Sequence, residues 1–269
     1  MLKTIARIGV PAMLAAAAAT TAEAADKPQI DTGDTAWLLM ATVLVLMMNI
    51  PGLALFYAGM VRKKNVLATA VQAFAVAALV TVLWFVVGYS LAFTDGGGLN
   101  GIIGSLSRAV GKGLQGSVHE LAKTVPENVF LMYQATFAVI TPAIIAGAFA
   151  ERMKFSAMMW FMALWVLFVY VPVAHWVWGG GFLGAAGVLD FAGGLVVHLN
   201  AGIAGLVCCI VIGKRHGYGT ENMAPHNLVL TLIGTSLLWV GWFGFNAGSA
   251  LASGELAGNA MLNTHIAAA

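Results

Sequence analysis

Long apolar segments dominate this sequence and restrict it to a membrane fold. A helix needs about 20 apolar residues to cross a lipid bilayer, and six segments reach that length, while a seventh begins near Met261. The six lie at about residues 37–61, 66–93, 128–150, 156–175, 191–213 and 228–250. Hydrophobic residues make up 60% of the chain and charged residues 9%, so a soluble domain could not bury its apolar surface. Since lipid offers no partner to a free backbone amide, the sequence predicts an all-α, polytopic membrane helix bundle.

Basic residues cluster after every second segment and predict the orientation of the bundle. Clusters at 62–64, 152–154 and 214–215 follow the first, third and fifth segments. Short loops rich in Lys and Arg stay in the cytoplasm. We therefore expect all three clusters on the cytoplasmic side and the N-terminus on the outer side.

Residues 1–24 are typical of a signal peptide. Lys3 and Arg7 form a basic start, an Ala-rich apolar stretch follows, and "AEA" (22–24) fits a cleavage site. The alternative is an extra membrane helix, but the stretch is short and weakly hydrophobic for that role. A cleaved signal predicts a multi-pass protein of the bacterial inner membrane whose mature N-terminus is periplasmic.

Net charge and reactive residues exclude several classes of function. A net charge of +2 is too small to indicate a nucleic-acid partner. Cys208 and Cys209 are neighbours inside an apolar segment, so we expect them to pack as small residues without a disulfide. The sequence shows no His, Cys or carboxylate set with metal-ligand spacing and no nucleophile with a base nearby, so we expect neither an enzyme nor a cofactor. We assign no catalytic role to His119, His175, His216, His226 and His265.

The C-terminal stretch "NTHIAAA" is apolar and has no closing charge, which predicts that the chain is part of something longer. We therefore expect residues 34–269 to form an incomplete transmembrane domain. The sixth segment contains "FNAG" (245–248) where the first contains "FYAG" (56–59), a faint sign of a second, inverted repeat that starts at the sixth segment. Chance explains a match of this length nearly as well.

A histidine lies inside the fifth segment, in "LDFAGGLVVHLNAGIAGL" (189–206). His198 follows Asp190 by eight residues, which places it about 12 Å along a helix and near the middle of the membrane. Gly194 and Gly202 lie one turn to either side, so we expect His198 on a close-packed face turned toward protein. A polar group at this depth is costly. Two interpretations stay open: a pore-lining histidine, or a buried one bonded to a carbonyl or a neighbouring helix.

Asp190 comes directly before the helix that would carry His198. Its carboxylate can accept hydrogen bonds from free backbone N–H groups and interact with the positive end of the helix dipole. A helix cap is therefore the favoured interpretation. The alternative is that Asp190 stabilises a cation at a pore mouth.

Four further residues occur at depths that suggest a path into the membrane. Trp178 and Ser249 are at the outer ends of the fourth and sixth segments, and Phe137 and Phe245 lie deeper. Aromatic faces can hold a small cation, with the Ser249 hydroxyl as an acceptor, and phenyl rings beneath would block water and ions. The alternative is that Trp178 belongs to an ordinary interfacial belt and that the Phe residues face lipid.

Several long motifs in one order give the sequence a specific resemblance. They are "PGLALFYAGMVRKKN" (51–65), "GAFAERMKFSA" (147–157), "AHWVWGGG" (174–181), the segment 189–206, "APHN" (224–227) and "GWFGFNAGSA" (241–250). On these motifs the chain resembles the ammonium transporter (Amt/Rh) family, on the bacterial Amt side, from about Asp34 to the final residue. The resemblance implies an ammonium transporter-like fold of two inverted halves, of which this chain supplies the first and the start of the second. It also implies a homotrimer with a pore in each subunit.

The resemblance assigns roles to the outer aromatic residues. By position, Phe137, Trp178 and Ser249 match an external site that recruits ammonium. Phe137 and Phe245 match a stacked gate beneath it. Tyr133 stands where a Phe often occurs, and it adds a hydroxyl near the mouth.

The resemblance also places Asp190 and His198. Asp190 matches a structural aspartate near the entrance, and His198 matches the first of two pore histidines. The second histidine belongs to a span beyond this sequence. The cytoplasmic tail through which many members contact PII signalling proteins is also beyond it.

These features predict an ammonium transporter or channel whose partners are ammonium and ammonia. A dry pore excludes both NH4+ and K+, because a bare charge is heavily penalised in a low-dielectric medium. Of these two ions, only ammonium can give up a proton and cross as neutral ammonia. His198 would form a hydrogen bond to the ammonia and relay the proton. We expect residues 1–269 alone to be inactive as a pore.

Two other functions stay open for a chain of this family. The first is an ammonium sensor without significant transport. The second is an Rh-like channel for neutral gas, although a cation site at Trp178 and Ser249 argues against it.

Overall fold

The computed structural model describes residues 29–269, and within that range the chain is helical, with an isolated bridge between His119 and Ala122 as its only β-structure. Six helical stretches there are long and apolar enough to cross a membrane. They are Thr32–Met60, Lys63–Phe93, Glu127–Phe149, Phe155–Ala185, Gly194–Ile212 and Leu228–Ala250. The six predicted segments are thereby confirmed, and the fourth is longer than predicted because it continues through the turn at Trp178. The signal peptide predicted at residues 1–24 lies outside the described residues.

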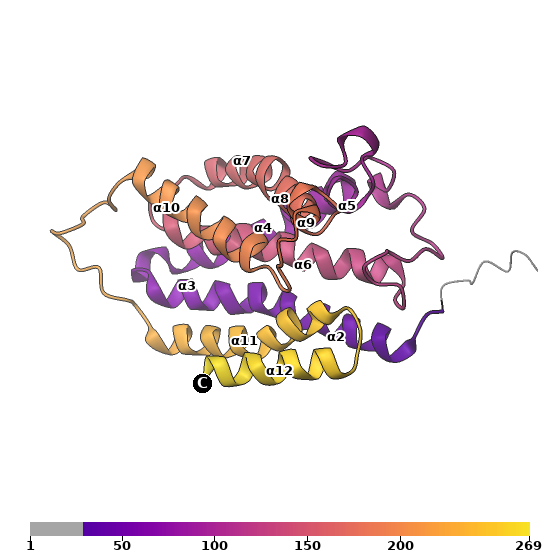
Figure 1. Cartoon of the computed structure of the whole chain (residues 1–269). Coiled ribbons are helices and arrows are strands. Elements are labelled where there is room, and N and C mark those ends of the chain that lie inside the picture. The colour runs from indigo at the N-terminus through magenta and orange to yellow at the C-terminus, as the bar shows by residue number, and fades with distance from the viewer. Residues whose placement is uncertain (1–28) are drawn as a thin grey trace, which may run out of the picture.

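Each stretch is built from shorter elements (Figure 1). The first contains α2 (Thr32–Met47) and α3 (Ala54–Met60), the second α4 (Val66–Leu83) and α5 (Tyr89–Phe93), and the third α6 (Glu127–Ile145). The fourth contains α7 (Phe155–Trp165), α8 (Val171–Val177) and α9 (Phe182–Ala185), the fifth α10 (Asn200–Ile212), and the sixth α11 (Leu228–Ala247), which α12 (Glu255–Ala268) follows. Short π-helical turns occur at Met48–Leu53, Trp84–Gly88, Val166–Tyr170 and Gly194–Leu199.

Helix α6 forms the centre of the bundle. Figure 1 shows it between α7 and α10 on one side and α3 and α11 on the other. Over an apolar 18-residue part of each stretch, 83% of the residues are buried in the stretch that contains α6, whereas 28–50% are buried in the other five. The outer helices turn apolar side chains away from the bundle, which suits a lipid environment because lipid tails are as apolar as these side chains. The third stretch therefore supplies the fixed surface against which functional side chains of other helices are placed.

The first stretch is interrupted at Asn49–Pro51. Ile50 has non-helical angles (φ −125°, ψ 105°), and Pro51 has no N–H to donate. Asn49 is fully buried, and its Nδ2 donates to the Ala73 carbonyl oxygen of α4 at 3.2 Å. Membrane helices tolerate such breaks where a neighbouring helix supplies polar partners.

Glycines on α11 allow close contact with the first stretch. A Cβ on Gly234 would lie 2.4 Å from the Phe56 backbone nitrogen, and one on Gly244 would lie 2.7 Å from the Ala41 carbonyl oxygen. Small residues let membrane helices approach closely, which favours dispersion contacts. The sequence predicted such a face on the fifth segment around Gly202. That prediction is wrong for the described residues, because a Cβ on Gly202 would meet nothing within 4 Å.

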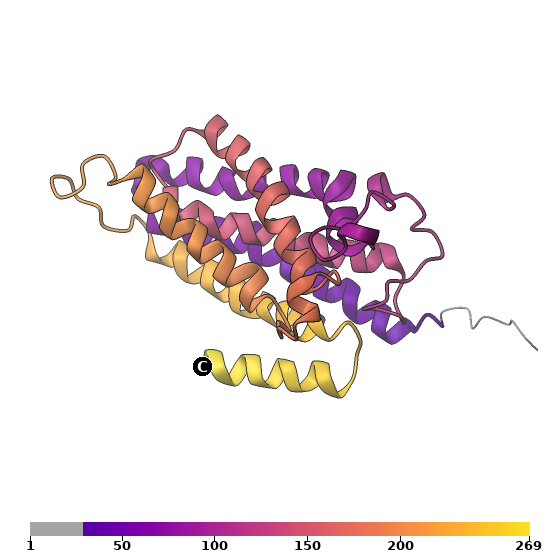
Figure 2. The ribbon, with the colours of Figure 1, turned by 45° about the horizontal axis from the view of Figure 1, so that its top comes forward.

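Helix α12 begins at Glu255, so the seventh helix, predicted to begin near Met261, starts earlier. Gly254 before it has a φ of +122°, which glycine adopts readily and other residues rarely adopt. The helix turns back along α11 and lies outermost in the bundle (Figure 2). Asn246 Nδ2 donates to Thr264 Oγ1 at 2.9 Å and joins the two helices.

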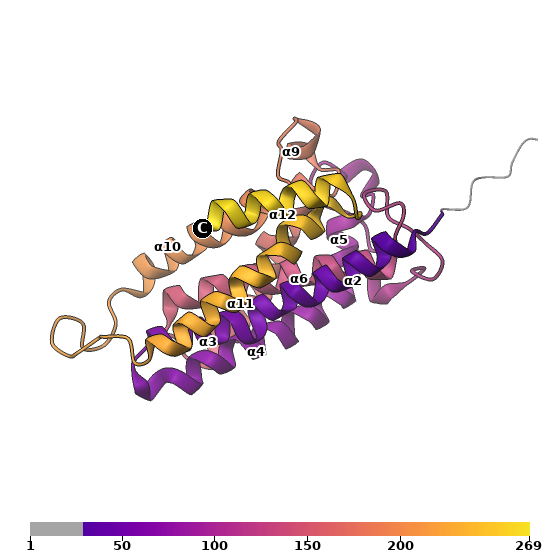
Figure 3. The same cartoon turned by 90° about the horizontal axis from the view of Figure 1, so that it is seen from below.

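The three basic clusters lie at the same end of the bundle, as predicted. Arg62 follows the first stretch and Arg215 follows the fifth, and both contact Glu151 after the third, at 2.8 Å and 3.7 Å. We call this end of the bundle the basic end. It consists of residues 62–64, 151–154 and 214–221. The opposite end carries residues 94–126 and 178–193. Figure 3 shows the long helices running between the two ends.

Gly234→Ala should destabilise the protein. The added methyl group overlaps the Phe56 backbone, and overpacking of this kind typically costs about 1–3 kcal/mol. Thermal unfolding in detergent should show a lower Tm. Gly202→Ala is the matched control, since Ala in a helix is favoured over Gly by about 1 kcal/mol and the site has room. An equal loss of Tm in both variants would contradict close packing of α11 on α3.

Candidate functional site

Trp178 lies where α8 ends, at the opposite end of the bundle. Its backbone N–H donates to the Ala174 carbonyl oxygen at 2.8 Å. Its indole Nε1–H donates to the Asp190 carbonyl oxygen, also at 2.8 Å. The indole therefore ties the end of the fourth stretch to the start of the fifth.

Four rings from four stretches form a continuous series, which we call the aromatic file: Trp178, Phe137, Phe245 and His198. The ring centroids of Trp178 and Phe137 are 6.0 Å apart and nearly perpendicular. Phe137 and Phe245 are 4.4 Å apart, and Phe245 and His198 are 5.6 Å apart. Both Phe side chains are 1% exposed. The rings are adjacent in the same order as the depths predicted from the sequence, while their depth in the membrane stays a prediction.

Ser249 is joined to the aromatic file through Tyr133. The Ser249 hydroxyl donates to the Phe245 carbonyl oxygen at 2.8 Å and lies 3.3 Å from the Tyr133 hydroxyl. The Tyr133 hydroxyl also lies 3.0 Å and 3.1 Å from the carbonyl oxygens of Gly244 and Phe245. Its ring is 5.0 Å from that of Phe137. Tyr133 is thus a buried link between α6 and α11, a role that its sequence position alone did not indicate.

Trp242 is a site residue that the sequence analysis missed. Its ring stacks with His198 at a centroid distance of 6.0 Å. It precedes Phe245 by three residues on α11, and residues at that spacing share one helix face. The spacing was the signal that could have identified it.

His198 does not face the interior of the described bundle. It lies in the π-helical turn Gly194–Leu199 and is exposed, with Trp242 and Phe245 on one side. Residues 29–269 leave the face that His198 shares with Gly194 and Gly202 uncovered, so the expectation that this face meets protein stays a prediction. Helical periodicity placed these residues correctly on one face, but it could not say which face would be covered.

Asp190 accepts four backbone hydrogen bonds at the start of the fifth stretch. Its Oδ1 accepts from Gly193 and Gly194 at 2.6 Å and 2.7 Å, and its Oδ2 accepts from Leu195 and Val196 at 2.9 Å each. The first N–H groups of a helix have no partner within the helix. The predicted cap is therefore confirmed, while a role for Asp190 toward a cation stays a prediction.

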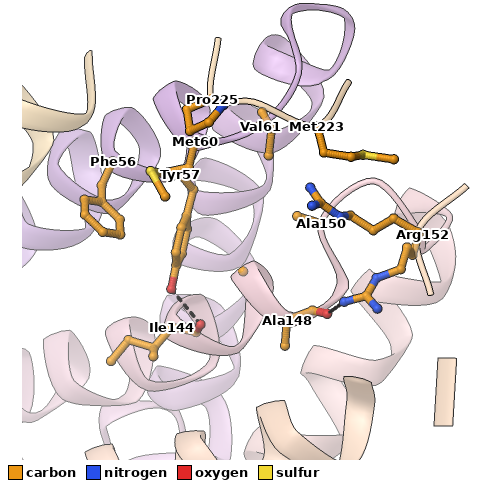
Figure 4. A pocket seen from close by; sticks show the side chains of 12 residues that line it. Phe56, Tyr57, Met60, Val61, Ile144, Ala148, Ala150, Arg152, Met223 and Pro225 are labelled. Carbon is orange, nitrogen blue, oxygen red and sulfur yellow. Dashed lines mark hydrogen bonds between the residues drawn. The ribbon is translucent and has the colours of Figure 1, made fainter. Parts of the chain in front are cut away.

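A pocket of about 470 Å³ lies at the basic end (Figure 4). Tyr57 reaches across it and donates from its hydroxyl to the Ile144 carbonyl oxygen at 2.8 Å. The Arg152 guanidinium donates to the carbonyl oxygens of Ala148 and Gly213. These donors are already used to hold the ends of the third and fifth stretches together.

An ion-pair network at the basic end centres on Glu151, whose side chain is 1% exposed. Arg62 donates to it from the backbone and from Nε, at 3.0 Å each. Burial by itself would raise the pKa of Glu151. Hydrogen bonds from Arg62 and Asn65 outweigh burial and lower the pKa to about 2.

The comparison with known proteins identifies the family. The Ammonium Transporter Family model matches residues 36–269. The chain belongs to the ammonium transporter family. An ammonium transporter of Bacillus subtilis is 53% identical over 237 residues, which are 88% of this chain and 57% of the relative. A putative ammonium transporter of Methanothermobacter thermautotrophicus is 51% identical over 240 residues, which are 89% and 58% of the two chains.

Solved structures agree with this family assignment. The crystal structure of Candida albicans Mep2 has a TM-score of 0.81 at 39% identity, over 90% of this chain and 53% of that one. A sensor Amt protein has a TM-score of 0.80 at 30% identity, over 88% and 59%. The chain thus spans somewhat more than half the length of these relatives.

Family membership decides several of the predictions. The all-α membrane fold with membrane-spanning helices is confirmed, and the bacterial Amt type is compatible with the relatives found. Members of the family are membrane transporters or channels and not enzymes. Over residues 29–269, moreover, no group of three or more His, Cys, Asp or Glu side chains is placed to hold a metal ion.

Asp190→Asn should destabilise the fifth stretch by about 2 kcal/mol or more. The variant removes the charge at the helix start and turns an amide nitrogen toward two backbone N–H groups, so two hydrogen bonds are lost. Thermal unfolding in detergent measures the change. Asp31→Asn is the control, since Asp31 accepts only one capping bond, from the Asp34 N–H at 2.8 Å. Equal losses in the two variants would show that the four-bond cap adds nothing.

The ion pairs of Glu151 should make stability depend on pH. Its folded pKa lies below the ordinary value of 4.5, so its contribution is complete above about pH 4.5 and is lost as pH falls toward 2. The Tm of the wild type in detergent should fall more between pH 6 and pH 3 than that of Glu151→Gln. Glu120→Gln, at a side chain that is 89% exposed, should follow the wild type. Parallel curves for Glu151→Gln and the wild type would refute this origin of the acid sensitivity.

Proposed function

We propose that the protein is an ammonium transporter or channel that recruits NH4+ at Trp178, Phe137 and Ser249, removes a proton, and conducts ammonia past His198. The observation that carries this proposal is the unbroken aromatic file, with buried Phe rings between Trp178 and His198. Membership of the ammonium transporter family supports the substrate.

Recruitment rests on the chemistry of the opposite end. The face of Trp attracts a cation more strongly than other aromatic faces do, and a cation–π contact contributes about 0.5–1 kcal/mol at exposed sites and more where water is excluded. Trp178 is half-buried and held at its indole N–H by Asp190, so its face has a defined position. The Ser249 oxygen can accept a hydrogen bond from NH4+, which distinguishes ammonium from K+.

The Phe137–Phe245 pair supplies the barrier. The two rings are in contact, and both are 1% exposed. A charged ion that passes between them would lose its hydration without a replacement, which is strongly unfavourable. Neutral ammonia carries no such penalty. Transfer of the ammonium proton to bulk water above the pair would therefore select ammonium over metal cations, which have no proton to give.

His198 is the acceptor beyond this barrier. One side of its ring lies against Trp242 and Phe245, and an imidazole nitrogen there can form a hydrogen bond to ammonia or carry a proton. The chain matches 57% and 53% of the relatives' own length, so each relative has a further segment that is available to cover this side of the ring.

We also place the protein in a bacterial inner membrane with the opposite end toward the periplasm. The basic end would then be cytoplasmic, as short basic loops usually are. We further propose a homotrimer that contacts PII signalling proteins through a cytoplasmic tail. The support for both assembly proposals is the family resemblance.

An ammonium sensor is the second candidate function. The likeness to a solved sensor Amt protein favours it. A sensor would need the same recruitment residues but no net transport.

Uptake of radiolabelled methylammonium tests the proposal in a full-length form of the protein, expressed in bacterial cells that lack their own ammonium transporters. His198→Ala should lower uptake by about tenfold or more, equivalent to about 1.4 kcal/mol of barrier, because ammonia and the proton lose their acceptor. Trp178→Leu should raise the half-saturating concentration. His216→Ala, at a loop histidine of the basic end that is 91% exposed, should behave as the wild type.

Other outcomes would decide between the candidates. Unchanged uptake in His198→Ala would refute the histidine role. Saturable binding without uptake would favour the sensor. Uptake that follows the concentration of neutral methylamine alone, whatever the residue at 178, would favour a gas channel.

A further inference from the structure

His175 lies in the last turn of α8, three residues before Trp178, and is 0% exposed. Its ring fits between two backbone carbonyl groups of the second stretch and the loop that follows. Nδ1 lies 2.9 Å from the Ala92 oxygen, and Nε2 lies 2.6 Å from the Asn100 oxygen. Both ring nitrogens therefore face hydrogen-bond acceptors.

Two acceptors require two ring protons. A neutral imidazole has one N–H and one lone pair, whereas an imidazolium donates from both nitrogens. His119 shows the neutral arrangement nearby: its Nε2 lies 2.9 Å from the Phe93 oxygen, while its Nδ1 accepts from the Leu121 N–H at 3.2 Å. In a neutral His175, by contrast, one lone pair would point at a carbonyl oxygen inside the protein.

We propose that His175 is a buried imidazolium that clamps the end of α5 to the turn carrying Trp178 and so positions Trp178. Ala92 is in the last turn of α5, and His175 is in the last turn of α8. The carbonyl end of a helix carries partial negative charge and stabilises a cation. His175 takes part in no ion pair with residues 29–269, so these carbonyl groups supply the compensation.

The clamp acts on Trp178 through the glycines that follow it. The N–H groups of Gly179 and Gly181 both donate to the His175 carbonyl oxygen at 3.0 Å. A Cβ on Gly179 would lie 1.9 Å from the Ala92 oxygen, so the turn is in direct contact with the group that His175 binds. The backbone leaving Trp178 is therefore fixed against the end of α5.

Further bonds surround this centre and join the same two segments. Asn100 Nδ2 donates to the Gly180 oxygen at 3.2 Å. Trp176 Nε1 donates to the Ile102 oxygen at 2.8 Å. These bonds are more exposed than the His175 pair, so His175 is the buried part of the connection.

Nitrogen NMR of the chain labelled with ¹⁵N-histidine tests the charge state directly. At neutral pH the His175 ring should give two N–H signals, and the His119 ring should give one. His175→Gln assigns the His175 signals by their loss. If that variant does not fold, the other histidines are replaced by Gln one at a time. Each replacement assigns the ring signals of the histidine it removes, and the signals left unassigned belong to His175. A single ring N–H on His175 would overturn the proposal.

The indole N–H signal of Trp178 tests positioning, with Trp178→Leu to assign it. His175→Gln should shift this signal, because a glutamine amide cannot span both carbonyl groups. His119→Gln is the matched control and should leave it unchanged. An unshifted Trp178 signal in a folded His175→Gln protein would overturn the positioning role. Gly179→Ala disturbs the same contact and should shift the signal too.

A consequence for transport rests on the proposed function. His175→Gln should raise the half-saturating methylammonium concentration several-fold, as Trp178→Leu does, while maximal uptake per folded protein stays within about twofold. A lower maximum at unchanged half-saturation would overturn positioning in favour of a merely structural role. If Trp178→Leu itself has no effect on half-saturation, the recruitment role fails, and the two NMR measurements still decide the clamp.

Discussion

The need to satisfy every backbone polar group inside a lipid bilayer shapes this protein at each of its irregular points. Where the fifth stretch begins, Asp190 accepts four N–H groups that no helix turn can use. Where the first stretch breaks at Pro51, Asn49 bonds to a neighbouring helix. At the end of α5, His175 takes up a free carbonyl oxygen. Each of these three departures from a regular helix has a polar side chain beside it, and such departures are where a membrane protein can place functional groups.

Helix α11 connects close packing with the candidate site. One face carries Gly234 and Gly244, which allow the backbone of the first stretch to approach. The same helix carries Trp242 and Phe245, which contact His198. The close approach fixes α11 against the bundle, so the Phe245 ring contacts the Phe137 ring of α6 at a defined distance. Ring positions in the aromatic file therefore depend on glycines that never touch it.

Ion pairs hold loops at both ends of the bundle. At the basic end, Arg62 and Arg215 surround a nearly fully buried Glu151, and charge holds three loops together. At the opposite end, Arg108 pairs with the buried Glu127, while hydrogen bonds to carbonyl oxygens from His175 and Trp178 hold the segments around Trp178. The Asp190 carboxylate lies in the segment that Trp178 binds, but its two oxygens already accept four backbone N–H groups.

The sequence by itself determined the membrane-spanning segments, their relative orientation, the Asp190 cap and the order in which the rings of the aromatic file follow one another. These follow from local properties: hydropathy, basic loops and the rise of a helix. Only the tertiary structure decided which helix faces are covered. It moved close packing from the fifth stretch to α11, left His198 exposed beside Trp242, and gave His175 two carbonyl partners. Periodicity places residues on a common face, but contacts between segments far apart in the chain determine what that face meets.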